Sequence, residues 1–218
     1  MLSFSLFRFR VTLQPSFWIV SLVLGWGSMS GQDGHPLRLA LWVSILFLSI
    51  LWHELGHAFA FRRFGIESEI VLYAMGGYAA PQSGRELTRG QDVAVSVAGP
   101  LFQLLIGVPL WWMDQQGMFW EFTQKRPFAW DAIWMLMWIN LTWALVNLLP
   151  VLPLDGGRIF RALCGPRLER TALWISLCCA IAAGVILISL RMTFNGMFFG
   201  MLAWNNWQRI SGNDEIAW

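Results

Sequence analysis

Six apolar segments follow one another along the chain, and only short stretches separate them. A helix that crosses a bilayer needs about 20 predominantly apolar residues. Most of the six segments reach this length, and the first is the shortest. They lie at about 16–30, 37–61, 91–113, 130–150, 170–190 and 193–209. We therefore expect a polytopic α-helical membrane protein with about six transmembrane helices, which form a single domain over residues 1–218.

The composition supports a membrane protein and excludes several other classes. Of the 218 residues, 56% are hydrophobic and 13% are charged, about half the charged fraction of an ordinary soluble domain. A chain with 15 Trp and 16 Phe lacks the low hydrophobicity of a disordered protein. The net charge of +2 is too small to favour nucleic acid as a partner. The lipid bilayer is the expected environment.

The distribution of Lys and Arg predicts how these spans are oriented. The N-terminus, the second and fourth connections and the C-terminus carry eleven of the 15 residues, whereas the first, third and fifth connections carry four. Connections on the cytoplasmic side of a membrane are enriched in Lys and Arg. We therefore expect a multi-pass protein of the cytoplasmic (inner) membrane with both termini in the cytoplasm.

Two stretches outside the spans have the patterns of β-strands. Residues 4–13 alternate between apolar and polar side chains, with a period of two. Residues 67–80 are rich in strand-forming residues and are interrupted by Gly76 and Gly77. Both stretches lie on the cytoplasmic side in the expected topology. We expect them to pair in a small membrane-associated β-sheet.

The second span ends in the sequence His53-Glu54-Leu55-Gly56-His57. Residues four positions apart lie on one face of a helix, so both imidazoles can bind one metal ion with Glu54 beside them. Ionisable side chains within a membrane span are costly and usually mark function. The alternative, two histidines that only form hydrogen bonds in the core, is therefore disfavoured. We expect a metal site here.

A third metal ligand must come from elsewhere in the chain. Asp155 is the only acidic residue between Asp131 and Glu169, and two prolines precede it. Irregular backbone at membrane depth occurs where it lines a cavity or is buried in protein. We therefore favour Asp155 as the ligand over the alternative that it caps a helix beginning at Gly156. Two His, one carboxylate and an open position are typical of catalytic zinc, although iron accepts the same ligands.

These motifs resemble those of the site-2 protease family of intramembrane zinc metalloproteases. The first is HELGH at 53–57, and the second is Asn-x-x-Pro-x-x-Pro-Leu-Asp-Gly-Gly-Arg at 147–158. The alternating N-terminal stretch, Met75-Gly76-Gly77 and Ala98-Gly99-Pro100-Leu101 extend the resemblance over most of the chain.

The resemblance implies roles for five residues. His53, His57 and Asp155 would bind one Zn²⁺ ion per chain, Glu54 would activate water, and Asn147 would help to stabilise the transition state. Relatives often have Asn a few positions after the Gly-Pro pair, where this chain has Gln103. We also expect a minimal form of the family, without the PDZ and CBS domains of many relatives.

The function implied is that of an intramembrane zinc endopeptidase, which hydrolyses a peptide bond in the transmembrane segment of a single-pass membrane protein. The main alternative is a non-catalytic scaffold or chaperone of the same fold. Such proteins usually lose the Glu or a metal ligand, and this chain keeps all four residues. A metal transporter is less favoured, because it would carry paired polar residues in several spans.

A substrate helix must be locally extended before it is cut, because its carbonyls are engaged in helical hydrogen bonds. An extended segment near lipid needs backbone partners, which a sheet edge supplies by strand addition. We expect an edge around Leu72–Tyr78 to bind substrate. The alternative is a hairpin that only packs at the membrane face. The candidate binding residues are Leu72, Tyr73, Met75, Gly76 and Gly77.

Overall fold

The computed structural model of the chain describes residues 1–26, 36–82, 84, 86–124 and 126–212. The chain forms two compact units. Unit 1 comprises Met1–Glu86 and Ala98–Ala144, and unit 2 comprises Leu87–Val97 and Leu145–Trp218. Two helices, α3 (Arg89–Gln115) and α5 (Pro127–Asn147), contribute residues to both units.

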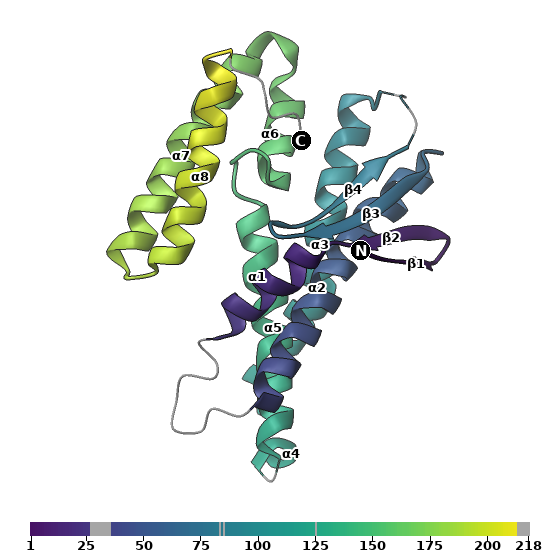
Figure 1. Cartoon of the computed structure of the whole chain (residues 1–218), viewed down its shortest axis with the longest axis vertical. Coiled ribbons are helices and arrows are strands. Elements are labelled where there is room, and N and C mark those ends of the chain that lie inside the picture. The colour runs from purple at the N-terminus through teal and green to yellow at the C-terminus, as the bar shows by residue number, and fades with distance from the viewer. Residues whose placement is uncertain (27–35, 83, 85, 125, 213–218) are drawn as a thin grey trace. The chain divides into compact units, whose positions relative to one another are not determined.

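Unit 1 contains a four-stranded sheet with the order β1-β2-β3-β4, which confirms the predicted sheet (Figure 1). Strands β2 and β3 are parallel, whereas the β1–β2 and β3–β4 pairs are antiparallel. The strands are β1 (Leu2–Leu6), β2 (Phe9–Leu13), β3 (Ser68–Tyr73) and β4 (Gly76–Pro81).

The N-terminal stretch forms a hairpin of two strands, where the alternation predicted one. The chain reverses at Phe7 and Arg8, whose φ angles are 50° and 70°. Positive φ at both central residues is the geometry of a tight two-residue hairpin turn. Because the turn is so short, the alternation of apolar and polar residues continues across it and conceals the break.

The core of unit 1 lies between this sheet and its helices. Apolar residues at alternate positions of β2 and β3 belong to this core and pack with residues of α1 (Pro15–Gly25), α2 (Pro36–Arg63) and α5. Helix α2 also contacts β3 and β4 directly. The sheet therefore rests on the helix that contains the HELGH sequence.

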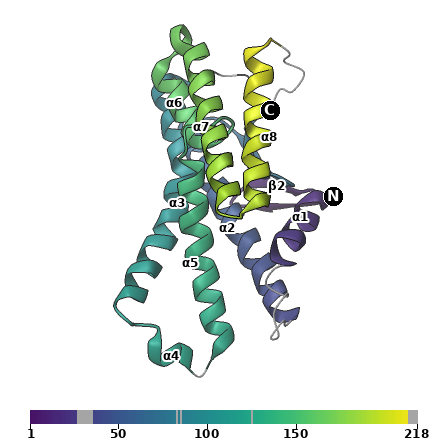
Figure 2. The same ribbon diagram turned by 90° about the vertical axis from the view of Figure 1, so that its left-hand side faces the viewer.

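In the described part of the chain, four helices are long and apolar enough to cross a membrane. They match the second to fifth predicted spans. They are Pro36–Arg63, Arg89–Gln115, Phe128–Asn147 and Pro166–Ser189, the last of which joins the 3-10 turn η2 (Pro166–Leu168) to α7 (Glu169–Ser189). Figure 2 shows α3 and α5 connected through the short helix α4 (Trp120–Gln124).

The first and last predicted spans are helices, but they do not meet the same criterion. The first forms α1, with 11 residues, and part of that predicted span lies outside the described residues. The last forms α8 (Thr193–Ile210), whose 18 residues include three Asn that lower its hydropathy. Four of the six predicted spans are thus candidate membrane-spanning helices in the described part of the chain.

Unit 2 consists mainly of α6, α7 and α8. Helices α7 and α8 lie side by side (Figures 1 and 2) and share an apolar core with residues of the preceding loop. Helix α6 (Asp155–Cys164) follows a loop that contains a cis peptide bond between Leu152 and Pro153. The sequence suggested a helix here only as an alternative, because two adjacent glycines are unfavourable in a helix.

Candidate metal centre

His53 and His57 lie one turn apart on α2, and their side chains are buried in unit 1. Their Nε2 atoms are 3.0 Å apart, and the two rings meet edge to face. Two imidazole nitrogens that bind one zinc ion tetrahedrally lie about 3.3 Å apart, given bonds of about 2.0–2.1 Å. The two Nε2 atoms are therefore close enough to bind a single metal ion.

Gln103 of α3 orients the first of these imidazoles. Its side-chain oxygen Oε1 lies 2.9 Å from Nδ1 of His53, and its Nε2 atom lies 3.5 Å from the Ser49 carbonyl oxygen. Because Oε1 accepts, the proton of His53 resides on Nδ1, and Nε2 keeps the lone pair that a metal requires. Hydrogen bonds of this kind set the tautomer and orientation of metal-binding histidines.

Ser49 and Asn140 extend this polar network to a third helix. Asn140 of α5 donates hydrogen bonds to the Ser49 hydroxyl, at 2.9 Å, and to the Leu136 carbonyl, at 2.8 Å. Gln103, Ser49 and Asn140 are all buried. The sequence analysis assigned none of these three a role at the site, although polar residues within apolar segments were the available signal.

Helix α3 makes its close approach to the two histidines at Gly99. A Cβ atom added there would lie 2.7 Å from Nε2 of His53 and closer still to Nε2 of His57. A Cβ atom on Gly56 of α2 would likewise lie 2.5 Å from the Ala98 carbonyl oxygen. The Ala-Gly-Pro sequence therefore has a structural basis, because only glycine leaves room for the imidazoles.

Glu54 is buried and lies against strand β4. A Cβ atom added to Gly77 would lie 2.8 Å from Cγ of Glu54 and 2.9 Å from its Oε1 atom. The sheet thus brings the backbone of β4 into contact with the carboxyl group that the sequence analysis expects to activate water. Gly77 has no side chain to separate them.

Tyr73 and Met75 lie beside this contact. Burial, with smaller contributions from the charges of Glu54 and Tyr78, raises the pKa of Tyr73 to about 12. The phenol therefore stays protonated at neutral pH. Met75 lies in the turn between β3 and β4, where Gly76 has a φ of 115°, a conformation that favours glycine.

The free edge of this hairpin lies at Gly76–Pro81, whereas the sequence analysis also included Leu72 and Tyr73. Those two residues belong to β3, which is an interior strand because the N-terminal strand β2 pairs with its other side. Directly after β4, the Gln82 N–H donates to the Glu67 carbonyl at 2.8 Å, so these two residues are a hydrogen-bonded pair of the antiparallel ladder.

The direction of each peptide group in β4 follows from the hydrogen bond between Gln82 and Glu67. Antiparallel pairing alternates, so Tyr78 and Ala80 direct their N–H and C=O groups towards β3. Gly77 and Ala79 direct theirs away from it. These two residues therefore form the hydrogen-bonding edge.

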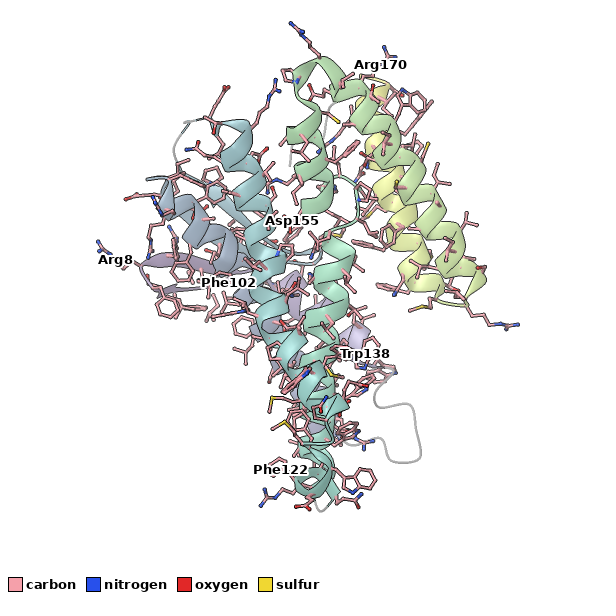
Figure 3. All side chains as sticks on the ribbon, turned by 180° about the vertical axis from the view of Figure 1, so that it is seen from behind. Arg8, Phe102, Phe122, Trp138, Asp155 and Arg170 are labelled. Atoms are coloured by element: carbon pink, nitrogen blue, oxygen red, sulfur yellow. The ribbon has the colours of Figure 1, made fainter. Side chains whose placement is uncertain are left out.

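In unit 2, Asp155 is the first residue of α6, and it is 6% exposed (Figure 3). Leu154 occupies the N-cap position, so Asp155 is not the helix cap that the alternative proposed. Asn147, the last residue of α5, lies at the start of the loop that leads to α6.

The two glycines after Asp155 allow close packing between α6 and the preceding loop. Both lie in the first turn of α6. A Cβ atom on Gly156 would overlap the Leu148 and Leu149 carbonyls, and one on Gly157 would lie 2.5 Å from the Leu152 nitrogen. Helix α6 therefore begins in direct contact with the backbone of the loop that precedes it.

The chain is similar to known metalloproteases. The model of peptidase family M50 matches residues 41–123 and 122–187. A zinc metalloprotease of Methanocaldococcus jannaschii is 32% identical over 120 residues, which cover 55% of this chain and 33% of the relative. A putative zinc metalloprotease of Synechocystis is 35% identical over 172 residues, which cover 73% of this chain and 42% of the relative.

A solved structure supports the same relationship at the level of the fold. The site-2 protease from Methanocaldococcus jannaschii has a TM-score of 0.63 at 23% identity, and the match covers 96% of this chain and 94% of that one. The chain spans less than half the length of each of the two metalloproteases, whose matched shares are 33% and 42%. Because the family model matches more than half of the chain, the chain belongs to peptidase family M50, the site-2 protease family.

Proposed function

We propose that this chain is an intramembrane zinc endopeptidase that hydrolyses a peptide bond in the transmembrane segment of a single-pass membrane protein. The observation that supports it most directly is the buried pair of imidazoles on α2, whose Nε2 atoms are 3.0 Å apart. A buried carboxyl group, Glu54, follows the first of them in the chain. The model of peptidase family M50 matches this part of the sequence, within residues 41–123.

His53, His57 and Asp155 are the proposed ligands of one zinc ion per chain. All three are buried, and each offers one ligand atom. Two imidazoles and a carboxylate that leave one position open match the donor set of catalytic zinc. The hydrogen bond from His53 to Gln103 supports the fit, because it holds the imidazole in its metal-binding tautomer.

The proposed mechanism uses Glu54 and Asn147. A bound zinc ion lowers the pKa of water and polarises a peptide carbonyl. Glu54 takes a proton from the attacking water and delivers it to the leaving amine. Asn147 donates a hydrogen bond from its side-chain amide to the developing oxyanion.

The substrate segment is proposed to bind as an added strand along β4. Gly77 and Ala79 offer outward-facing peptide groups, and Gly77 contacts Glu54. A strand paired there has its own peptide groups next to the general base. Met75 lies in the adjoining turn, and Gly76 is the first residue of β4. Leu72 and Tyr73 pair with β4 from the neighbouring strand β3.

We propose that the protein lies in the cytoplasmic membrane with both termini in the cytoplasm, as the distribution of Lys and Arg predicts. His57 is five residues before Arg62, which is about 7.5 Å along a helix at about 1.5 Å per residue. The metal centre is then close to the cytoplasmic face, where water can reach it.

Two variants test this function in detergent-purified protein incubated with candidate single-pass substrates. Glu54→Gln removes the base but no ligand, so we expect about one equivalent of zinc and no cleavage. His53→Ala removes a ligand, so we expect loss of both zinc and cleavage. Cleavage by Glu54→Gln at the wild-type rate, or by a zinc-free preparation, would contradict the proposal.

A further inference from the structure

Two buried polar side chains, Ser176 of α7 and Asn206 of α8, bind the loop that precedes Asp155. The Leu152 N–H donates to the Ser176 hydroxyl oxygen at 2.7 Å, and the Leu152 carbonyl accepts from the Asn206 amide at 2.8 Å. Ser176 in turn donates to Oδ1 of Asn206 at 2.8 Å. Both side chains are 1% exposed.

Each polar group of the two side chains has a fixed role as donor or acceptor in this network. The Nδ2 atom of Asn206 also donates to the Leu202 carbonyl at 2.8 Å, within α8. A reversed amide would place its oxygen against two carbonyl oxygens, so the orientation of Asn206 is determined. Because a buried polar group without partners is costly, the network strongly favours one position of the Leu152 peptide groups.

The position of Leu152 determines where α6 begins. The Leu154 N–H donates to the Val151 carbonyl at 2.8 Å, which keeps the intervening turn compact. Gly157, two residues after Asp155, packs against the Leu152 nitrogen so closely that a Cβ atom there would lie 2.5 Å away. A displacement of Leu152 would therefore move the first turn of α6 and the Asp155 carboxylate with it.

We propose that Ser176 and Asn206 are positioning residues for Asp155, which act through the two backbone groups of Leu152. The inference rests on the proposed role of Asp155 as a zinc ligand. It assigns helices α7 and α8 a part in zinc binding, although neither contributes a ligand. If the two residues only join α7 to α8, their loss lowers the melting temperature and leaves zinc affinity unchanged.

The first test compares two replacements of equal shape at one position. Ser176→Thr keeps the hydroxyl group, and Ser176→Val replaces it with a methyl group. We expect Ser176→Thr to keep the zinc affinity of the wild type within about twofold, and Ser176→Val to lose roughly tenfold or more, by analogy with other indirect supports of metal ligands. Affinity is measured on purified full-length protein by competition with a chromogenic chelator.

The second test uses neighbouring asparagines on α8. Asn206→Leu removes the bonds to Leu152, whereas Asn205→Leu changes an adjacent residue outside the network. We expect weaker zinc binding and an altered visible spectrum of the Co²⁺-loaded protein for Asn206→Leu only, because the spectrum reports ligand geometry. Melting temperatures of the metal-free proteins separate this effect from a loss of stability.

The outcomes distinguish this inference from the proposed function. If Asp155→Ala loses zinc while Ser176→Val and Asn206→Leu bind it like the wild type, the positioning role is wrong and the ligand role stands. If Asp155→Ala itself keeps full zinc affinity, the proposed ligand is wrong, and the inference is wrong with it. If Asn206→Leu does not fold, the comparison of Ser176→Thr with Ser176→Val decides.

Discussion

Nδ1 of His53 lies 2.9 Å from Oε1 of Gln103 and joins α2 to α3 through a buried hydrogen bond. The sequence analysis noted Gln103 only as a departure from the family motif, and the contact shows what its side chain does in this chain. It sets the tautomer and orientation of one imidazole from a neighbouring helix.

The first prediction is that Gln103 supports zinc binding. Gln103→Leu removes the acceptor for the His53 Nδ1–H, so we expect zinc affinity to fall roughly 10- to 100-fold. Gln103→Glu keeps an acceptor oxygen and should retain most of the affinity. Gln115→Leu, at the exposed end of the same helix, is the control. Equal chelator competition curves for Gln103→Leu and the wild type would show that the contact is dispensable.

The second prediction concerns the close approach of α3 at Gly99. Gly99→Ala places a methyl group on the facing Nε2 atoms of both histidines, so we expect loss of zinc and of cleavage. Gly90→Ala in the same helix has no atom within 4 Å of the added group, and alanine favours helix. It should bind zinc normally. Zinc analysis of both purified variants is the measurement, and a Gly99→Ala protein with full zinc would refute the packing argument.

The third prediction concerns a variant that disturbs the proposed general base, Glu54, without affecting zinc binding. Gly77→Ala places a methyl group 2.8 Å from Cγ of Glu54, so the carboxyl group must shift. We expect slower cleavage with zinc content unchanged. Gly84→Ala, which has no atom within 4 Å of the added group, is the control. Equal cleavage rates for the two variants would show that the contact between Gly77 and Glu54 does not matter for catalysis.

The fourth prediction tests strand addition at β4. Ala79→Pro removes an outward-facing N–H, and proline is tolerated on an edge strand. We expect weaker cleavage of a transmembrane substrate, chiefly through a higher KM, with zinc retained. Ala79→Ser changes the side chain but keeps the N–H and should behave like the wild type. An unchanged KM for Ala79→Pro would exclude pairing at this residue.

The fifth prediction concerns orientation in the membrane. In a variant whose native cysteines are replaced by alanine, Glu86→Cys should be labelled from the cytoplasmic side and Glu121→Cys from the opposite side. The expectation follows from the distribution of Lys and Arg. In intact cells, a membrane-impermeant maleimide should therefore label Glu121→Cys and leave Glu86→Cys unlabelled. The reverse pattern would place the metal centre near the other face.

Local features of this protein could be predicted from its sequence. Two histidines four positions apart on a helix face the same side whatever surrounds them, and the structure places the Nε2 atoms of His53 and His57 together. The apolar length of α2, α3, α5 and α7 likewise required no knowledge of their neighbours. The strand around Ile70 was likewise predicted from its local content of strand-forming residues.

The order of contacts between distant segments could not be predicted. The sequence analysis expected residues 4–13 and 67–80 to pair in one sheet, but nothing in either stretch indicates that β2 pairs with β3 rather than with β4, which makes Leu72 interior to the sheet. The bond between His53 and Gln103 depends on how α2 and α3 are rotated against each other. The helix that begins at Asp155 was considered only as an alternative. The contact of Gly156 and Gly157 with the preceding loop, which explains two glycines in the first turn of a helix, is not visible in the local sequence.

In the proposed strand addition, Pro81 would limit how long a substrate stays bound. It occupies the next outward-facing position of β4 after Gly77 and Ala79, and it has no N–H to offer. Gly77 and Ala79 would form four backbone hydrogen bonds with an added strand, each worth about 0.5–1.5 kcal/mol net. Binding of that strength would permit rapid dissociation, so the two fragments of a cut segment could leave before the next substrate arrives. A longer edge would hold its products and would also expose the protein to pairing with other chains.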